Sequence, residues 1–79
     1  MISERMKKVI LRALRLKEFD LRDETRAYEV PGWDSLNHVV VLAAIEKEYN
    51  LRFRSHEVLP LSNIGDLQAL VDRKMADAR

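Results

Sequence analysis

The sequence predicts an all-α fold in which three main helices and one short helix form a four-helix bundle with a long first loop. Apolar residues recur every three or four positions near both ends of the chain, a spacing typical of amphipathic helices. Between these stretches lies a largely apolar run that is long enough for about four helical turns. We therefore expect main helices near residues 3–16, 35–49 and 63–76, and a short helix near residues 55–59.

The composition favours a small binding or carrying module over an enzyme. The chain has 79 residues, 47% of them hydrophobic and 34% charged, as expected of one folded domain spanning residues 1–79. A domain of this size has a marginal core and little room for a catalytic cleft with several buried residues. The chain contains two histidines and no cysteine, so we expect neither disulfides nor a recognisable metal site.

The hydrophobic pattern predicts no membrane insertion. The longest apolar run, from Val39 to Ile45, is far shorter than the roughly 20 residues that a membrane-spanning helix needs. The first residues do not form the apolar segment of a secretory signal. We therefore expect a cytoplasmic protein.

The first helix is expected to be amphipathic. Ser3 is suited to cap it, because a serine hydroxyl can accept a hydrogen bond from the first free N–H groups. Lysine and arginine occupy the other face, which we interpret as a solvated surface. The expected inward positions are Ile2, Met6, Val9, Ile10, Ala13 and Leu14, and the basic positions are Arg5, Lys8, Arg12 and Arg15.

Residues 17–34 show neither a helical nor an alternating period, so we expect a long loop. Residues 20–25 are suited to a short helical turn within it, and Pro31 with Gly32 turns the chain into the next helix. Four apolar side chains are expected to anchor the loop on the helices, namely Phe19, Leu21, Tyr28 and Val30.

The central helix carries the run Val39–Val41, which a buried strand would also favour because its residues are β-branched. Length decides for a helix, since Ala, Glu and Lys residues between positions 43 and 48 continue the same stretch. We expect Val41 on the flank of the inward stripe and Val40 exposed. The inward stripe itself is expected to consist of Leu36, Val39, Leu42, Ile45 and Tyr49.

The last third of the chain contains a helix stop, a short helix and the final helix. Asn50 is suited to end the central helix, and Phe53 is expected to fill the core from the connection. Ser55 can cap the short helix, and Ser62 or Asn63 can cap the final one. The inward positions expected for the final helix are Ile64, Leu67, Leu70, Val71 and Met75.

Ser35 stands where the central helix begins, directly after Asp34. Either residue can cap the helix through its side-chain oxygen. A serine hydroxyl at this place points outward at the positive end of the helix dipole, beside free backbone N–H groups. An anionic group attached to that hydroxyl, such as a phosphate, would be stabilised there.

The spacing of these features resembles that of acyl carrier proteins. The tripeptide Asp34-Ser35-Leu36 opens the central helix of a short four-helix chain. The match extends over nearly the whole chain, through the apolar positions of the first and central helices, Tyr28 in the long loop, Phe53 after the central helix and residues 62–67 at the start of the last helix. The tripeptide alone is weak evidence, whereas all these spacings together are specific.

The resemblance implies a carrier protein rather than an enzyme. In this family the serine of the motif, here Ser35, is esterified by 4′-phosphopantetheine from coenzyme A, and acyl groups travel as thioesters on the terminal thiol. Asp34 would cap the helix and assist recognition by the phosphopantetheinyl transferase, while Leu36 would fasten the motif to the core. The other implied partners are acyl-loading and acyl-processing enzymes of fatty-acid, polyketide or specialised lipid biosynthesis, which the carrier would serve as a monomer.

Two departures from the family pattern concern partner choice. Asn37 and Val40 stand where the family usually has acidic residues that contact partner enzymes, and Trp33 replaces a small residue before the motif. With these departures the chain resembles free-standing carriers of specialised pathways. Trp33, Asn37, His38 and Val40 are therefore candidates for partner contacts, although Trp33 is more simply explained as a packing lid and His38 as a surface residue.

Two alternatives stay open. A peptidyl or aminoacyl carrier would share both the fold and the serine. An unmodified helical interaction module is supported by the basic first helix and a pI of 8.1, but a nucleic-acid partner is not expected, because residues 18–34 are acidic. A hydrolase built on Ser35 and His38 is excluded, since the chain has no Gly-x-Ser-x-Gly elbow and predicts no sheet to support an oxyanion hole.

Overall fold

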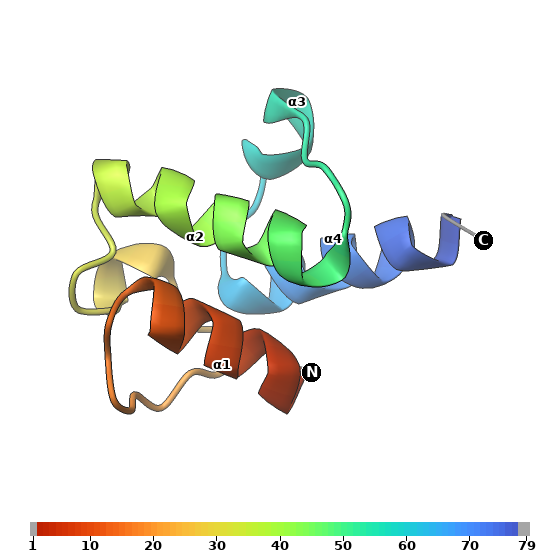
Figure 1. Ribbon diagram of the computed structural model, residues 1–79. Coiled ribbons are helices and arrows are strands. Elements are labelled where there is room, and N and C mark those ends of the chain that lie inside the picture. The colour runs from red at the N-terminus through yellow and green to blue at the C-terminus, as the bar shows by residue number, and fades with distance from the viewer. Residues whose placement is uncertain (1, 78–79) are drawn as a thin grey trace.

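A computed structural model describes residues 2–77 and shows an all-helical chain (Figure 1). Its helices are α1 (Glu4–Ala13), α2 (Ser35–Tyr49), α3 (Ser55–Val58) and α4 (Ile64–Asp77), with a 3₁₀ helix, η1, at Ala27–Glu29. Residues 2–77 contain no strand, so the predicted all-α fold with three main helices and one short helix is confirmed. The 3₁₀ helix in the first loop was not predicted.

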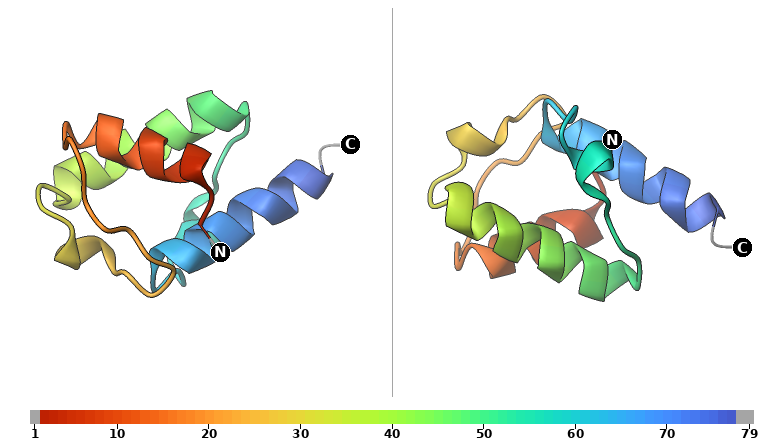
Figure 2. Two further views of the ribbon diagram at one scale, coloured as in Figure 1. Left: turned by 90° about the horizontal axis from the view of Figure 1, so that it is seen from below. Right: turned by 90° about the horizontal axis from the view of Figure 1, so that it is seen from above.

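The helices α1 and α2 pack side by side in opposite directions, and α4 lies on one side of this pair, behind it in the view of Figure 1 (Figures 1 and 2). Arg5 at the start of α1 reaches the end of α2, where its Nε lies 2.7 Å from Glu48 Oε2 and its guanidinium lies 4.3 Å from the centre of the Tyr49 ring. The short helix α3 lies beside α4, to which Glu57 is joined by a 2.9 Å ion pair with Lys74. The main contact between helices in the bundle is therefore that of α1 with α2, whereas the short helix α3 contributes a smaller contact.

The core lies between α1, α2 and α4, with the first loop closing one end. The predicted inward positions of α1 are confirmed, because Met6 and Ile10 are fully buried and Ile2, Val9 and Leu14 are nearly so. Burying an aliphatic side chain of this size contributes about 1.5–3 kcal/mol, so this face holds the small domain together. The fully buried side chains are Met6, Ile10, Val41, Ile45, Ile64, Leu70 and Val71.

The inward face of α2 differs from the predicted stripe. Val41 is fully buried instead of lying on the flank, and Leu42 is only half-buried. Leu36 and Val39 were predicted to point inward, but they are 76% and 64% exposed. Ile45 and Tyr49 are buried and Val40 is exposed, as expected. The helix is apolar on nearly every side, so periodicity alone could not fix its rotation.

Helix α1 ends earlier than predicted because of its backbone at Arg15. This residue has a left-handed conformation with φ of 58°, while the Leu16 N–H donates to the Leu11 carbonyl at 2.9 Å. Such a bond from the second residue past the cap is typical of helix ends that usually carry glycine. The chain uses arginine there instead, which leaves no glycine signal in the sequence.

The first loop is anchored by Leu21 and Val30, which are buried as predicted. Tyr28 was predicted to be a third anchor, but it is 77% exposed. The expected helical turn at residues 20–25 is only a hydrogen-bonded turn, in which the Thr25 N–H donates to the Arg22 carbonyl at 3.1 Å. Phe19 is half-buried and packs against the core, as predicted. Tyr28, in η1, points outward, and Trp33 at the end of the loop is buried as a further aromatic anchor.

The final two helices follow the prediction with three differences. The carbonyl of Arg54, and not the Ser55 side chain, accepts the first hydrogen bond of α3, from the Glu57 N–H at 2.9 Å. Asn63, one of the two predicted caps, does cap α4, because its Oδ1 accepts from the Asp66 N–H at 2.8 Å. Met75 is exposed rather than buried, and the core-facing face of α4 includes the polar Gln68, which is only 4% exposed.

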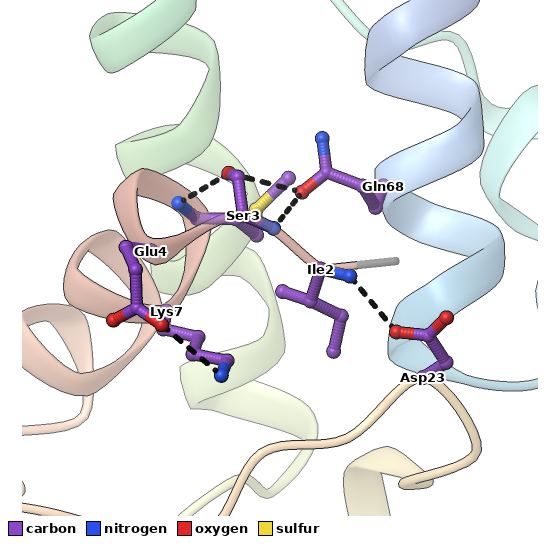
Figure 3. A network of polar contacts seen from close by, with 7 residues as sticks. Ile2, Ser3, Glu4, Lys7, Asp23 and Gln68 are labelled. Carbon is purple, nitrogen blue, oxygen red and sulfur yellow. Dashed lines mark hydrogen bonds and ion pairs between the residues drawn. The ribbon is translucent and has the colours of Figure 1, made fainter.

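The beginning of the chain is joined to the first loop and α4 by a polar network (Figure 3). Gln68 Oε1 accepts hydrogen bonds from the Ser3 N–H at 3.0 Å and from Ser3 Oγ at 3.2 Å. The Ile2 N–H donates to Asp23 Oδ1 at 2.8 Å, and this bond lowers the pKa of the Asp23 carboxyl. We call Ile2, Ser3, Asp23 and Gln68 the N-terminal joint.

The same loop also contacts the start of α4 through the backbone. The Gly65 N–H donates to the Asp23 carbonyl at 2.8 Å. A side chain at Gly65 would place its Cβ at 2.8 Å from that carbonyl oxygen, which is too close for any residue but glycine. The loop is therefore fixed at both Asp23 and Val30, and its last residues lead into α2 from a defined position.

Candidate functional site

A tight turn positions the start of α2. Gly32 has a φ of 80°, a left-handed conformation that glycine adopts without strain. The Trp33 N–H donates to the Val30 carbonyl at 3.1 Å, and Asn37 Nδ2 donates to the Gly32 carbonyl at 2.7 Å. The turn is thus tied to the helix that follows it, and Asn37 has a structural role at this place.

Asp34 caps α2 and Ser35 is its first residue. Asp34 Oδ1 accepts a hydrogen bond from the Asn37 N–H at 2.8 Å, which confirms the predicted cap. Ser35 is exposed, and within residues 2–77 no group accepts from its N–H or from the N–H of Leu36. The hydroxyl of Ser35 therefore stands at the positive end of a four-turn helix, near two free donors.

An apolar surface borders Ser35. Leu36, Val39 and Val40 are exposed on consecutive turns of α2, with 76%, 64% and 42% of their surface accessible. The expectation that Leu36 fastens the motif to the core is wrong, because its side chain faces solvent. Three exposed aliphatic side chains on one helix form a surface suited to contact with another protein.

On another side of the same helix, the ring of His38 meets that of Trp33. Trp33 is 9% exposed, which confirms its interpretation as a packing residue. Its indole Nε1–H donates to His38 Nδ1 at 3.1 Å, and the two ring centres are 6.2 Å apart. His38 is exposed, as predicted for a surface residue, but one of its nitrogens is held by the loop. This contact could not be read from the sequence pattern.

An outer depression and an inner cavity adjoin at Trp33 and His38. The outer depression surrounds the serine and is lined by Ala27, Tyr28, Trp33, Asp34, Ser35 and His38. The inner cavity, of about 70 Å³, lies among α2, α3 and α4, and includes Leu42, Val58 and Leu67 in its wall. Ala27, Trp33 and His38 belong to both linings.

This geometry suits attachment of a group rather than catalysis by Ser35. The Asp34 carboxylate is engaged by the helix N-terminus and His38 Nδ1 by Trp33, so neither orients a base toward the serine in the way that a hydrolytic triad requires. The part of the chain described, residues 2–77, holds no cluster of histidine and acidic residues suited to a metal ion. None of its helices has both the length and the apolar character to cross a membrane.

The predicted site residues thus divide by location. Asp34, Ser35 and Leu36 lie together at the start of α2, and Val40 extends the apolar surface one turn further. Asn37 is hydrogen-bonded to the turn at Gly32, and Trp33 is buried in the core. Whether Trp33, Asn37, His38 and Val40 contact partner proteins stays a prediction.

Comparison with known proteins identifies the family. No protein-family model matches the sequence. The fold is similar to the solution NMR structure of a holo acyl carrier protein from Geobacter metallireducens, with a TM-score of 0.85 and 32% sequence identity. The similarity covers 92% of this chain and 84% of the other. With this identity over most of both chains, the protein belongs to the acyl carrier protein family.

Proposed function

We propose that Ser35 is the attachment point of 4′-phosphopantetheine and that the protein carries acyl groups for partner enzymes in fatty-acid, polyketide or specialised lipid biosynthesis. The observation that carries this proposal is the exposed Ser35 hydroxyl at the first position of α2, after the Asp34 cap. The similar chain from Geobacter metallireducens is a holo acyl carrier protein, which supports a prosthetic group on this one too.

The residues around Ser35 fit a phosphodiester. The free N–H groups of Ser35 and Leu36 can donate to phosphate oxygens, and the helix dipole favours the negative charge. When bound, phosphopantetheine would supply a flexible arm whose thiol holds acyl groups as thioesters. Asp34 would keep the helix start ordered while the serine hydroxyl remains accessible to the transferase, which donates the group from coenzyme A.

We further propose that the apolar surface formed by Leu36, Val39 and Val40 docks onto partner enzymes through an apolar groove beside their active-site entrance. The surface begins one residue after Ser35, so a groove seated on it would bring the arm to that entrance. No acidic side chain occurs between Ser35 and Ile45. Without acids to steer encounters, contact area must supply the affinity, and carriers of this kind suit dedicated enzymes better than general fatty-acid synthesis enzymes.

Intact-mass measurement tests the attachment. The wild-type protein is incubated with coenzyme A and a broad-specificity phosphopantetheinyl transferase, and we expect the mass to increase by one phosphopantetheinyl group. Ser35→Ala should not be modified. Ser55→Ala is the matched control, because Ser55 is also an exposed first residue of a helix, α3, and this variant should be modified like the wild type. Modification of Ser35→Ala, or an unmodified wild type with several active transferases, would refute the proposal.

A further inference from the structure

His38 has one nitrogen bound and one free. Its Nδ1 accepts the hydrogen bond from Trp33 Nε1, and an indole N–H can only donate. A neutral imidazole that accepts at Nδ1 carries its proton at Nε2. Trp33 therefore selects the tautomer of His38 in which Nε2 is a donor. Among residues 2–77, no acceptor is hydrogen-bonded to this Nε2.

The free donor belongs to the same depression as Ser35. His38 follows Ser35 by three positions on α2, so the two side chains lie on neighbouring turns of one helix face. Both line the outer depression, together with Ala27, Tyr28, Trp33 and Asp34. Trp33 is buried and bonded to His38 Nδ1, so the histidine ring is held at the edge of this depression rather than free to rotate.

The charges of the depression make a donor at this place useful. Asp34 contributes a carboxylate directly beside Ser35, and a phosphodiester on Ser35 would add a second negative charge. Of the six lining residues, His38 alone has a side chain that can carry positive charge. An N–H donor from the neutral His38 imidazole, which still accepts from Trp33 at Nδ1, would offset the repulsion between the two anions.

We infer that His38 is a positioning residue for the prosthetic group, whose Nε2–H donates to the phosphodiester on Ser35 while Trp33 holds its tautomer. This inference rests on the proposed function, because it requires the phosphate at Ser35. As a consequence, the first atoms of the arm would be held near Trp33 and His38, which line both the outer depression and the inner cavity.

The first half of the test uses the unmodified protein. With ¹⁵N-labelled histidine, NMR shifts of the ring nitrogens distinguish the two neutral tautomers at slightly alkaline pH. We expect His38 to show one tautomer with hydrogen on Nε2, and the exposed His56 on α3 to show a mixture. Trp33→Phe keeps the aromatic packing but removes the indole donor, so it should give His38 the mixed pattern of His56. A mixture at His38 in the wild type would overturn the inference.

The second half uses the modified protein and its ³¹P resonance. A phosphodiester does not titrate between pH 5 and 8, where histidine ordinarily does. Besides His38, the residues lining the depression and the cavity include only Asp34 and Tyr28 as titratable groups. We therefore expect the ³¹P shift of the wild type to follow the protonation of His38.

Two variants make this measurement decisive. His38→Ala should give a ³¹P shift that stays flat from pH 5 to 8, whereas His56→Ala should behave like the wild type. His38 is exposed, so its truncation is not expected to unfold the domain. A flat response in the modified wild type, or a persistent one in modified His38→Ala, would overturn the inference and leave the proposed function intact. Failure to modify Ser35 at all would overturn both.

Discussion

The N-terminal joint pairs its polar groups within the protein, whereas the start of α2 leaves polar groups exposed without a partner among residues 2–77. In the joint, Gln68 is almost fully buried, and its amide both accepts from Ser3 and donates to Asp72 at 2.9 Å. At the start of α2, two backbone N–H groups have no partner within residues 2–77 and the aliphatic Leu36 is 76% exposed. We infer that the N-terminal joint contributes to the stability of this small domain, and that the start of α2 keeps a surface available for other molecules.

The largest effect should come from comparing two aliphatic residues of α2. Ile45 is fully buried and Val39 is 64% exposed. Ile45→Ala should lower the free energy of unfolding by about 2–5 kcal/mol, because it leaves a cavity in the core, whereas Val39→Ala should change it by less than about 0.5 kcal/mol. Urea unfolding followed by circular dichroism measures both. Equal losses would contradict the observed rotation of α2.

Much of the fold was predictable because α1 and α4 have one clearly apolar side. In α2 the prediction failed at Leu36, Val39 and Val41. When a helix has apolar residues on nearly every side, their spacing does not indicate which side faces the core. In the observed rotation Val41 and Ile45 are buried. The Asn37 amide donates to the Gly32 carbonyl, and the Trp33 indole donates to His38 Nδ1. These contacts depend on the geometry of the preceding turn, which sequence spacing does not reveal.

The site shows the same division between local and distant information. Ser35 and its Asp34 cap were predictable, because helix capping depends on neighbouring residues alone. Tyr28 and Trp33 could not be distinguished as loop anchors, since either aromatic ring would fill space between helices. The turn at Gly32 leads Trp33 into the core and leaves Tyr28 outside.

The second largest effect should come from the N-terminal joint. Gln68→Ala removes the acceptor for the Ser3 N–H and should cost about 1–3 kcal/mol of unfolding free energy, because a polar group is left without its partner. Asp72→Ala removes only an exposed partner of the same glutamine and serves as the control, with a smaller loss. If both variants unfold at the same urea concentration, the joint does not have the stabilising role assigned to it.

A smaller effect should appear at acidic pH, in the N-terminal joint and at the contact between α3 and α4. The Ile2 N–H lowers the pKa of Asp23, and the hydrogen bond from Lys74 lowers the pKa of Glu57, which joins α3 to α4. A carboxyl whose pKa is lowered by folding stabilises the protein above its unfolded pKa, about 4, and loses this contribution as pH falls through the folded value.

Asp23→Asn and Glu57→Gln should therefore each weaken the dependence of thermal stability on pH below about pH 5. Asp77→Asn, at the exposed end of α4, is the control and should follow the wild-type curve. A curve for Asp23→Asn or Glu57→Gln that is as steep as that of the wild type would show that the bond concerned does not favour the charged form.

The smallest effect on stability is expected for Val40→Glu, which places an acid on the exposed side of α2. It should raise the rate at which general fatty-acid synthesis enzymes use the carrier, by adding electrostatic steering, and this gain should shrink with added salt. Asn37→Asp would add a second acid, but it would also replace the amide that donates to the Gly32 carbonyl. Val40→Glu alone is therefore the cleaner variant. An unmutated protein that already works with those enzymes as fast as an acidic carrier would contradict the proposed docking.

The claim that α2 separates a stabilising surface from a surface for partners is tested most directly by Leu36→Ala with two measurements on one protein. We expect the free energy of unfolding to change by less than about 0.5 kcal/mol, because this side chain faces solvent. The rate of phosphopantetheine transfer should fall by roughly tenfold, as expected when about 1.4 kcal/mol of contact with the transferase is lost. A loss of stability as large as that of Ile45→Ala, together with an unchanged transfer rate, would contradict the account.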